Sequence, residues 1–357
     1  MRYFATAVPG LHAVLVREIG ELPGAQAAPL REFDGRNDIV PFAARGHDGL
    51  LALRTSEDVF AEVASVQGHG RLGSVVRGLW DRRGLEQALS AYGAAVQPLR
   101  ARMTFRVVSR VRSERRFLRT ELRDELSRRV LQSRPRWRIA DPADLELWVL
   151  ETSPGRFRLG IRLSSATMRH RNGRPTERPG ALRPTVAAAM ARLAGPRPPG
   201  RVLLDPCCGS GTVLREAAAL GWEPVGGDLD PTAVEVAHHT LGTLTLGTLT
   251  LGTLGRARLF RADVRRLPLT DASVAAVASN LPFGKQYELQ GRPERWFAAT
   301  LDELARVVRP DGRIVLLVPS SPAFQGALGR QPAVQLAERL ELRLLGMRTA
   351  LWSLHRR

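Results

Sequence analysis

Three aspartates follow three short apolar segments, each at a point where a strand is expected to end. Asp205 follows Val-Leu-Leu, and Asp228 and Asp263 follow two further apolar segments downstream. Asp228 lies 23 residues after Asp205, the spacing at which an acid after a second strand typically binds ribose hydroxyls. We expect Asp263 to accept a hydrogen bond from an exocyclic amine such as that of adenine. Taken alone, Asp263 also fits a helix cap, but three such acids in succession favour a ligand site.

The segment that begins at Asp205 is a turn leading into a helix, and it reads Asp205-Pro206-Cys207-Cys208-Gly209-Ser210-Gly211-Thr212. Glycines let the backbone approach a ligand closely, and a helix N-terminus offers free N–H groups to an anionic part of it. A dinucleotide fingerprint needs a third glycine where Leu214 stands, and no phosphate-binding Lys-Ser or Lys-Thr pair follows. The turn therefore disfavours NAD and ATP as ligands.

A second polar turn, Asn280-Leu281-Pro282-Phe283-Gly284, follows a fourth apolar segment. The side-chain oxygen of Asn280 and the backbone carbonyl of Leu281 are two acceptors. Together they can hold both hydrogens of an amino group and free its lone pair. Pro282 fixes the turn, and Phe283 can stack on a base. Such a site needs no general base, because alignment and electrostatics supply the rate.

Alternating strands and helices position these turns in the second half of the chain. We expect strands at 202–204, 223–227, 257–260, 274–279 and 313–318, with helices at 212–220 and 232–239. This alternation predicts an α/β, doubly wound parallel sheet, with an antiparallel pair at 340–346 and 349–355. Residues 240–254 repeat Thr-Leu-Gly-Thr-Leu three times. A five-residue period matches neither helix nor strand, so we expect a loop there.

The first half mixes strands and helices without regular alternation, which indicates an α+β arrangement. The expected strands are 2–8, 38–42, 49–55, 102–110, 144–151 and 156–164, and the expected helices are 11–22, 57–67, 85–95 and 116–133. A composition change places the boundary between the halves near 167–180.

The chain is strongly basic. It carries 53 basic and 35 acidic side chains, a formal net charge of +18, and a pI near 11.4. Such an excess favours a polyanionic partner, and nucleic acid first. Between residues 100 and 138 there are 14 arginines against four acids. A solvated helix face explains any single one of them, but the excess in one region predicts phosphate contacts.

These motifs resemble those of a known family. Asp-Pro-x-Cys-Gly-Ser-Gly-Thr at 205–212, followed by Asn-x-Pro-Phe at 280–283, resembles the signature of S-adenosylmethionine-dependent methyltransferases that act on exocyclic amines. The Leu-Pro-Phe-Gly version is similar to that of THUMP-domain RNA guanine-N2 methyltransferases, which modify tRNA. The likeness extends over nearly the whole chain through looser motifs at 8–11, 54–60, 104–107, 160–163 and 182–185.

The resemblance implies a domain order as well as a reaction. It implies a ferredoxin-like segment at 1–50, a THUMP-like RNA-binding domain at 51–166, and a Rossmann-like methyltransferase domain with a seven-stranded sheet at 167–357. The implied reaction is S-adenosyl-L-methionine-dependent methylation of the N2 amine of a guanosine in tRNA. Because a base inside a helix cannot reach such a pocket, the guanosine must be flipped out or unpaired.

The residues that carry these expectations fall into three groups. The catalytic turn is Asn280, Leu281, Pro282 and Phe283. The cofactor is expected to contact Pro184, Asp205, Pro206, Gly209, Ser210, Gly211, Thr212, Asp228, Leu229, Asp263 and Val264. The RNA is expected to contact Arg106, Arg110, Arg112, Arg115, Arg116, Arg119 and Lys285, the only lysine of the chain.

Two alternatives remain open. One is methylation of an exocyclic amine in rRNA or DNA, because members of this subtype often carry Asp where Asn280 stands. The other is an RNA-binding protein with an inactive methyltransferase domain, against which the intact acids and glycines argue. Adjacent Cys207 and Cys208 suit no disulfide framework. We further expect a cytoplasmic monomer that uses no metal and contacts no membrane; a weak secretory signal at the N-terminus is disfavoured because Pro9-Gly10 breaks the apolar run.

Overall fold

The computed structural model describes residues 1–28, 31–68, 71–112, 117–165, 168, 170–171, 181–196, 201–242, 258–282, 291–344 and 347–357. Contacts within the chain divide it into two units, Met1–Arg169 (unit 1) and His170–Arg357 (unit 2). Within the described ranges, no helix is both long and apolar enough to cross a bilayer.

Unit 1 contains a nine-stranded sheet in the order β2-β4-β1-β5-β9-β8-β6-β7, with β3 beside β4. The strands are β1 (Arg2–Ala7), β2 (Gln26–Ala27), β3 (Glu32–Phe33), β4 (Asp38–Ala43), β5 (Asp58–Gln67), β6 (Thr104–Arg110), β7 (Arg138–Ile139), β8 (Leu145–Ser153) and β9 (Arg156–Arg162). Paired strands run antiparallel, except that β6 is parallel to β7 and β8.

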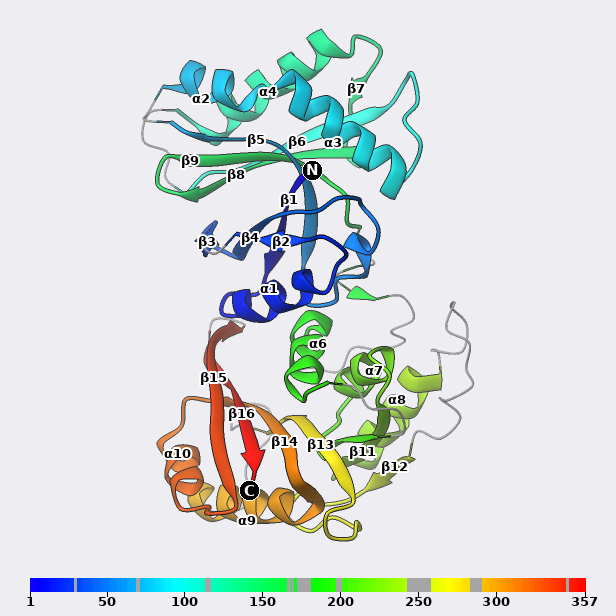
Figure 1. The fold of residues 1–357 in the computed structure, drawn as a ribbon, viewed down its shortest axis with the longest axis vertical. Coiled ribbons are helices and arrows are strands. Elements are labelled where there is room, and N and C mark those ends of the chain that lie inside the picture. The colour runs from blue at the N-terminus through cyan, green and yellow to red at the C-terminus, as the bar shows by residue number, and fades with distance from the viewer. Residues whose placement is uncertain are drawn as a thin grey trace. The chain divides into compact units, whose positions relative to one another are not determined.

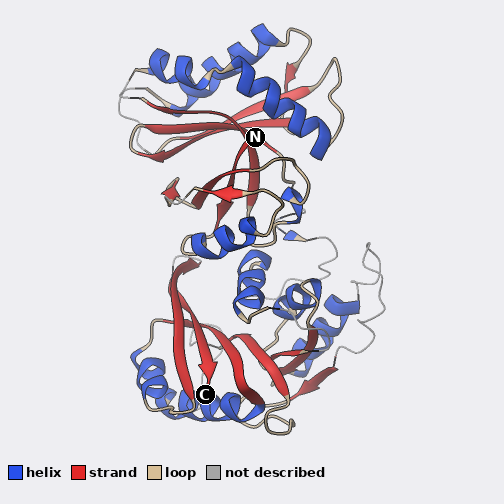
Figure 2. Ribbon diagram, viewed as in Figure 1, coloured by secondary structure: helices blue, strands red, loops and turns tan. Residues whose placement is uncertain are grey.

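The helices of unit 1 are α1 (His12–Gly20), the 3-10 turn η1 (Leu50–Ala52), α2 (Leu72–Leu79), α3 (Arg82–Ala95) and α4 (Arg119–Ser133). Helices α2, α3 and α4 gather over the part of the sheet formed by β5, β9, β8 and β6 (Figure 1). Strand β1 pairs with β5, from Tyr3 opposite Ala61 to Thr6 opposite Asp58. The segments 1–50 and 51–166 therefore share one sheet, whose strands are red in Figure 2.

Two predictions in unit 1 are wrong. Residues 57–67 do not form a helix but β5, and residues 49–55 contain η1 rather than a strand. The first seven residues of β5 are all buried, so both faces of the strand are covered there, and five of the seven are apolar, namely Val59, Phe60, Ala61, Val63 and Ala64. Consecutive apolar residues do not distinguish a buried strand from a buried helix, which explains the error. Helix α2 had no counterpart among the predictions.

Unit 2 contains a seven-stranded sheet in the order β12-β11-β10-β13-β14-β16-β15. The strands are β10 (Val202–Asp205), β11 (Glu223–Asp228), β12 (Arg258–Arg261), β13 (Val274–Asn280), β14 (Val308–Pro319), β15 (Val334–Leu344) and β16 (Met347–Arg356). The first five are parallel, and β16 is antiparallel to β14 and β15. The expected α/β sheet with a terminal antiparallel pair is therefore present.

The helices of unit 2 are α6 (Pro184–Leu193), α7 (Thr212–Ala219), α8 (Pro231–Gly242), α9 (Pro293–Val307) and α10 (Pro322–Gly329). Helices α6, α7 and α8 cover one face of the sheet, and α9 and α10 cover the other (Figure 1). Apolar side chains from β10, β13 and β14 pack with aromatic residues of the second helix layer, where Phe324 contacts both Phe297 and Trp352 edge-on. This covering of both faces explains why the parallel strands read as nearly continuous apolar runs.

The Thr-Leu-Gly repeat is only partly within the described residues. Thr240 to Gly242 form the last residues of α8 rather than a loop, because Thr240 and Leu241 are buried there. The remainder of the repeat, from residue 243, lies outside the described residues.

Unit 1 also buries a charged cluster. The guanidinium of Arg158 on β9 donates two hydrogen bonds of 2.7 Å to the carboxylate of Glu32 and one to that of Glu62. The side chains of Arg158, Glu32 and Glu62 are 10%, 8% and 2% exposed. A buried charge is tolerated only while its partners compensate for its lost hydration. Removing one of these three side chains should therefore destabilise the unit.

We predict that Arg158→Ala lowers the free energy of unfolding by ~3–5 kcal/mol, because it leaves the buried carboxylates of Glu32 and Glu62 with only the more exposed guanidinium groups of Arg156, at 3.6 Å, and Arg2, at 3.4 Å. Arg128→Ala is the matched control, since the Arg128 side chain is 62% exposed and its ion pair with Glu125 lies at the surface. That control should cost less than ~1 kcal/mol. Urea unfolding of the full chain checks both values, and equal costs for the two variants would contradict the prediction.

Candidate active site and arginine groove

The three predicted acids of unit 2 meet at one edge of the sheet. Asp205 ends β10, Asp228 ends β11, and Asp263 follows β12 by two residues. Because β10, β11 and β12 are parallel neighbours, their carboxyl ends lie side by side. The pKa of the nearby Cys207 thiol is raised well above its ordinary value. Burial is the largest cause, and the negative charges of the three carboxylates add to the rise. The edge is therefore acidic around the turn that follows β10.

That turn is held by hydrogen bonds that its backbone N–H groups donate to β11. The N–H of Cys208 donates to the carbonyl of Gly227 at 2.8 Å, and the N–H of Gly209 donates to Oδ2 of Asp228 at 2.9 Å. Gly209 and Gly211 have φ of +51° and +76°, the left-handed region that favours glycine.

The two glycines differ in what a side chain would meet. A Cβ at Gly211 would lie 3.2 Å from Ala237 of α8, so that glycine lets α8 approach the turn. A Cβ at Gly209 would meet no atom of the described residues within 4 Å. Gly209 thus borders open space that a ligand can enter, beside the Asp228 carboxylate.

Asp228 keeps the capacity to bind a diol. Its Oδ1 accepts from the N–H of Asp230 at 3.0 Å, and Asp230 in turn accepts from the N–H of Thr232 at the start of α8. Asp230, not Asp228, therefore caps the helix. A carboxylate has about four acceptor positions, so two backbone hydrogen bonds leave Asp228 able to accept two hydroxyls. Leu229 follows with half of its side chain exposed, an apolar surface next to that acid.

Asp263 is engaged by Arg265. The backbone N–H and the guanidinium of Arg265 both donate to it, with Nη2 to Oδ2 at 2.5 Å. These hydrogen bonds from Arg265 lower the pKa of the Asp263 carboxyl. Asp263 thus caps a turn, a role close to the helix cap that the sequence analysis gave as the alternative. An incoming amine would share the carboxylate with Arg265. The neighbouring Val264 is buried.

Within the described residues, the hydrogen-bond partners of Asp205 are neutral groups. Its Oδ1 accepts from the hydroxyl of Ser279 at 2.7 Å and from the N–H of Cys207 at 3.2 Å. Burial raises the pKa of Asp205 to about 7, Asp228 adds to the rise, and the two hydrogen bonds oppose it. Ser279 was not among the predicted site residues, although a polar residue at the end of an apolar strand was a signal that could have identified it.

Asn280, at the end of β13, has an orphaned acceptor. Its Oδ1 is buried and receives no hydrogen bond from the described residues. A buried acceptor without a donor costs free energy, so such an atom marks a place where a ligand N–H fits. The next residue fixes the turn, because the Leu281 side chain is in the core and its N–H donates to the carbonyl of Leu317 at 3.3 Å. Pro282 is described and half-buried, whereas Phe283 and Lys285 lie outside the described residues.

The other predicted cofactor residues pack around the same turn. Pro184 is the buried first residue of α6, which packs on α7. The hydroxyls of Ser210 and Thr212 lie 3.3 Å apart, and both side chains are nearly buried. Pro206 precedes them in the turn and is buried.

The predicted arginines of unit 1 make local contacts. Arg106 pairs with Glu146 and Asp141, and Arg110 lies 3.6 Å from Asp34 and stacks 4.4 Å from the Trp148 ring. Arg112 lies over Phe33 and donates its backbone N–H to Glu151. Arg115 and Arg116 lie outside the described residues. Part of the positive charge of this region is therefore neutralised within the unit.

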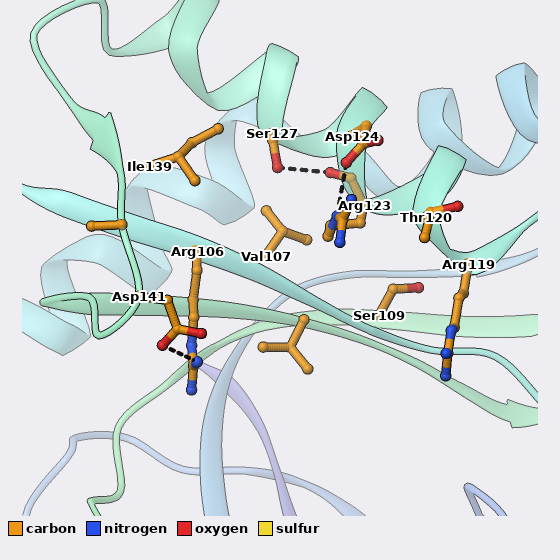
Figure 3. A pocket seen from close by; sticks show the side chains of 12 residues that line it. Arg106, Val107, Ser109, Arg119, Thr120, Arg123, Asp124, Ser127, Ile139 and Asp141 are labelled. Carbon is orange, nitrogen blue, oxygen red and sulfur yellow. Dashed lines mark hydrogen bonds and ion pairs between the residues drawn. The ribbon is translucent and has the colours of Figure 1, made fainter.

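A groove of about 570 Å³ opens beside β6 (Figure 3). It is lined by one edge of β6, the first turns of α4 and the segment at β7, with the residues Arg106, Val107, Val108, Ser109, Arg119, Thr120, Arg123, Asp124, Ser127, Ile139, Ala140 and Asp141. Strand β7 pairs only with Thr104 and Phe105, so within the described residues β6 has no strand partner on this side beyond Phe105. Arg119 and Arg123 lie on the helix side of the groove (Figure 3).

Comparison with known proteins agrees with this fold. Residues 171–344 match the model of a protein family described as "RMKL-like, methyltransferase domain". The crystal structure of TrmN from Thermus thermophilus superposes with a TM-score of 0.76 at 24% identity, over 100% of this chain and 99% of that one. A predicted N6-adenine-specific DNA methylase from Listeria monocytogenes superposes with a TM-score of 0.69 at 18% identity, over 99% and 95%. Fold and matched domain together define a methyltransferase.

Sequence relatives narrow the class. The tRNA (guanine(6)-N2)-methyltransferase of Thermus thermophilus is 31% identical over 335 residues, which are 91% of this chain and 91% of the relative. The chain therefore belongs to the same family, the guanine-N2 methyltransferases. The human tRNA (guanine(6)-N(2))-methyltransferase THUMP3 is 31% identical over 56% of this chain, and the match spans 40% of the human protein.

The raised pKa of Asp205 predicts how stability depends on pH. Between the ordinary pKa of Asp and about 7, the folded chain binds more protons at Asp205 than the unfolded chain, so this group lowers stability as pH rises through that range. Asp205→Asn stays neutral. At about pH 8 it should raise the free energy of unfolding of the ligand-free chain by on the order of 1–4 kcal/mol, and at about pH 5 by less than half as much, because pH 5 lies only about one unit above the ordinary pKa of Asp.

Calorimetry at the two pH values checks this. Asp311→Asn is the matched control, because Asp311 is exposed at φ of +62°, which Asn tolerates. An Asp205→Asn variant less stable than wild type at the higher pH would contradict the prediction. It would show that interactions in the folded chain offset the cost of burying the ionised carboxylate.

Proposed function

We propose that this chain transfers the methyl group of S-adenosyl-L-methionine to the N2 amine of a guanosine in tRNA. The observation that carries the proposal is the buried Oδ1 of Asn280, which lacks a donor at the end of β13 in a chain that belongs to the guanine-N2 methyltransferases. The matched segment of the chain spans 35% to 40% of two mammalian relatives but 91% of the Thermus relative, which supports the same reaction for the whole chain.

The site around Gly209 fits the proposed cofactor. Asp228 would hold the ribose hydroxyls, Leu229 and Val264 would flank the adenine, and Asp263 would accept from its amino group beside Arg265. Asp205 would face the cationic part of the cofactor, because a buried carboxylate without a cation favours one. When bound, the cofactor supplies an electrophilic sulfonium methyl group.

The catalytic turn would act on the amine rather than on the methyl group. A guanine amino nitrogen is a weak nucleophile because its lone pair is delocalised into the ring. Oδ1 of Asn280 and the carbonyl of Leu281 would accept its two hydrogens and localise the lone pair on nitrogen. Transfer then forms the N–C bond as the S–C bond breaks, and the nitrogen loses one proton to water. Most of the rate would come from alignment and preorganised acceptors.

Unit 1 would bind the RNA. We propose that it combines the ferredoxin-like segment (1–50) and the THUMP-like domain (51–166), while residues 167–357 form the methyltransferase domain. The groove beside β6 is the described surface that best supports phosphate contacts, because Arg119 and Arg123 line it and its opposite wall exposes a strand edge. Arg106 would contribute less, since it pairs with two carboxylates, whereas Arg123 pairs with the exposed carboxylate of Asp124.

The remaining parts of the proposal concern setting rather than chemistry. We propose a cytoplasmic monomer that needs no metal, which sedimentation and metal analysis of the purified chain would test. Nucleoside mass spectrometry of tRNA and rRNA from a deletion strain is the test of the substrate. Loss of N2-methylguanosine from tRNA supports the proposal, and loss from rRNA alone would move it to the other RNA.

We predict that Asn280→Ala slows single-turnover methylation by ~10²–10³, because it removes one of two preorganised acceptors. Affinities for S-adenosylmethionine and tRNA should stay within a few-fold of wild type. Asn37→Ala in unit 1 is the matched control and should react at the wild-type rate. An Asn280→Ala variant that also reacts at that rate would refute the proposed role of the turn.

We predict that the double change Arg119→Ala and Arg123→Ala weakens tRNA binding and reduces the salt dependence of log K by up to about two phosphate contacts. Arg128→Ala is the control on the same helix, since Arg128 does not line the groove. Fluorescence anisotropy with labelled tRNA at several salt concentrations measures both. An unchanged salt slope in the double variant would place the phosphate contacts elsewhere.

A further inference from the structure

The strands β10 and β13 are the neighbours between which the strand order of the sheet reverses. Strand order runs from β10 to β11 and β12 on one side and from β13 to β14 on the other, so the pair β10/β13 is the topological switch point. Backbone pairing between the two strands is recorded at Leu203 with Ala276 and at Leu204 with Val277. Asp205 and Ser279 lie just beyond this last pair. Ligands of open α/β sheets bind in the crevice at such a point.

One side-chain hydrogen bond bridges that crevice. The hydroxyl of Ser279 donates to Oδ1 of Asp205 at 2.7 Å, and both side chains are almost fully buried. The second donor, the N–H of Cys207, also donates to Oδ1, so both of these hydrogen bonds engage the same carboxylate oxygen. Ser279 directly precedes Asn280, the proposed catalytic residue, so one hydroxyl links the cofactor turn to the catalytic turn.

We propose that Ser279 is a positioning residue for cofactor binding: its hydroxyl holds Asp205 across the switch point in the ionised form that a cationic cofactor needs. The inference rests on the proposed function, because it takes S-adenosylmethionine as the cation. It assigns a further residue to cofactor binding. It also implies that binding releases a proton from Asp205 whenever the ligand-free chain carries one there.

The surroundings of Asp205 agree with this role. On β11 the facing charge is Asp228, which opposes ionisation of Asp205. The thiols of Cys207 and Cys208 in the turn have raised pKa values because of burial, so they stay neutral. On α7 the charged Glu216 is paired with Arg171 at 3.2 Å. Ser279 and the Cys207 N–H are thus the groups that favour the carboxylate, and burial raises its pKa to about 7, so its charge changes near neutral pH.

The test is calorimetric binding of S-adenosylmethionine to the full chain between about pH 6 and 9. In wild type the Kd should be about tenfold weaker at about pH 6 than on the plateau above pH 8, because only about a tenth of the carboxyl groups are ionised one unit below the pKa. Buffers of different ionisation enthalpy should report close to one proton released at the lower pH and close to none at the higher.

Ser279→Ala separates positioning from a merely structural role. It should shift the pH dependence of Kd upward by roughly one unit, the effect of losing one hydrogen bond to a charged group, and approach the wild-type Kd at about pH 9. Ser279→Thr, which keeps the hydroxyl, should restore the wild-type profile. Ser273→Ala, an exposed serine of unit 2 whose hydroxyl donates to the Thr270 carbonyl, is the matched control.

The outcomes distinguish this inference from the proposed function. An equal loss of affinity by Ser279→Ala at every pH, or a wild-type Kd independent of pH, overturns the role of Ser279 while leaving the methyltransferase proposal intact. Asp205→Asn supplies an independent check, because its binding should be weak and independent of pH across the range. Failure of wild type to bind S-adenosylmethionine at any pH overturns both proposals.

Discussion

The carboxyl ends of the parallel strands of unit 2 lie at one edge of the sheet, and the candidate active site depends on this constraint. Asp205, Asp228, Asp263 and Asn280 are spread over 76 residues of sequence, yet each comes at or just after the end of a strand. Parallel pairing alone brings them to the same edge. The strand order reverses between β10 and β13, which is where open α/β sheets generally bind their ligands.

Burial gives these polar groups their chemical character. Asp228 and Asp263 receive hydrogen bonds from backbone N–H groups, and Asp263 also has the guanidinium of Arg265. Within the described residues, Asp205 accepts from one hydroxyl and one N–H, and burial raises its pKa in spite of these two hydrogen bonds. Asp205 and Asp263 look equivalent in sequence, yet burial raises the pKa of Asp205 and the hydrogen bonds from Arg265 lower that of Asp263.

Unit 1 shows the same principle with cations. The net charge of +18 favours a nucleic-acid partner, but several arginines of the unit are matched by carboxylates on neighbouring strands. Arg158 is buried between Glu32 and Glu62, where it contributes to the interior of the unit and not to its surface potential. The groove beside β6 also has arginines of α4 in its lining, and one of them, Arg123, is paired with Asp124. Charge counting thus favours a class of partner but does not single out the residues that would contact it.

The sequence by itself determined the α/β architecture of unit 2 and the turns of its site. Glycines with positive φ, acids after apolar segments and the Asn-Leu-Pro turn are local features whose spacing survives without tertiary information. Periodicity also predicted most strands of unit 1, but it misassigned β5, because a strand covered on both faces lacks the alternation that marks a half-buried one.

Only the tertiary structure decided which groups pair. The hydrogen bond from Ser279 to Asp205 joins residues 74 positions apart, and the ion pair of Arg158 with Glu32 joins residues 126 positions apart. Neither has a local sequence signal, since both arise where separate strands come together. Strand order and burial set these contacts, and with them the ionisation of Asp205, because hydration and partners are properties of the folded chain.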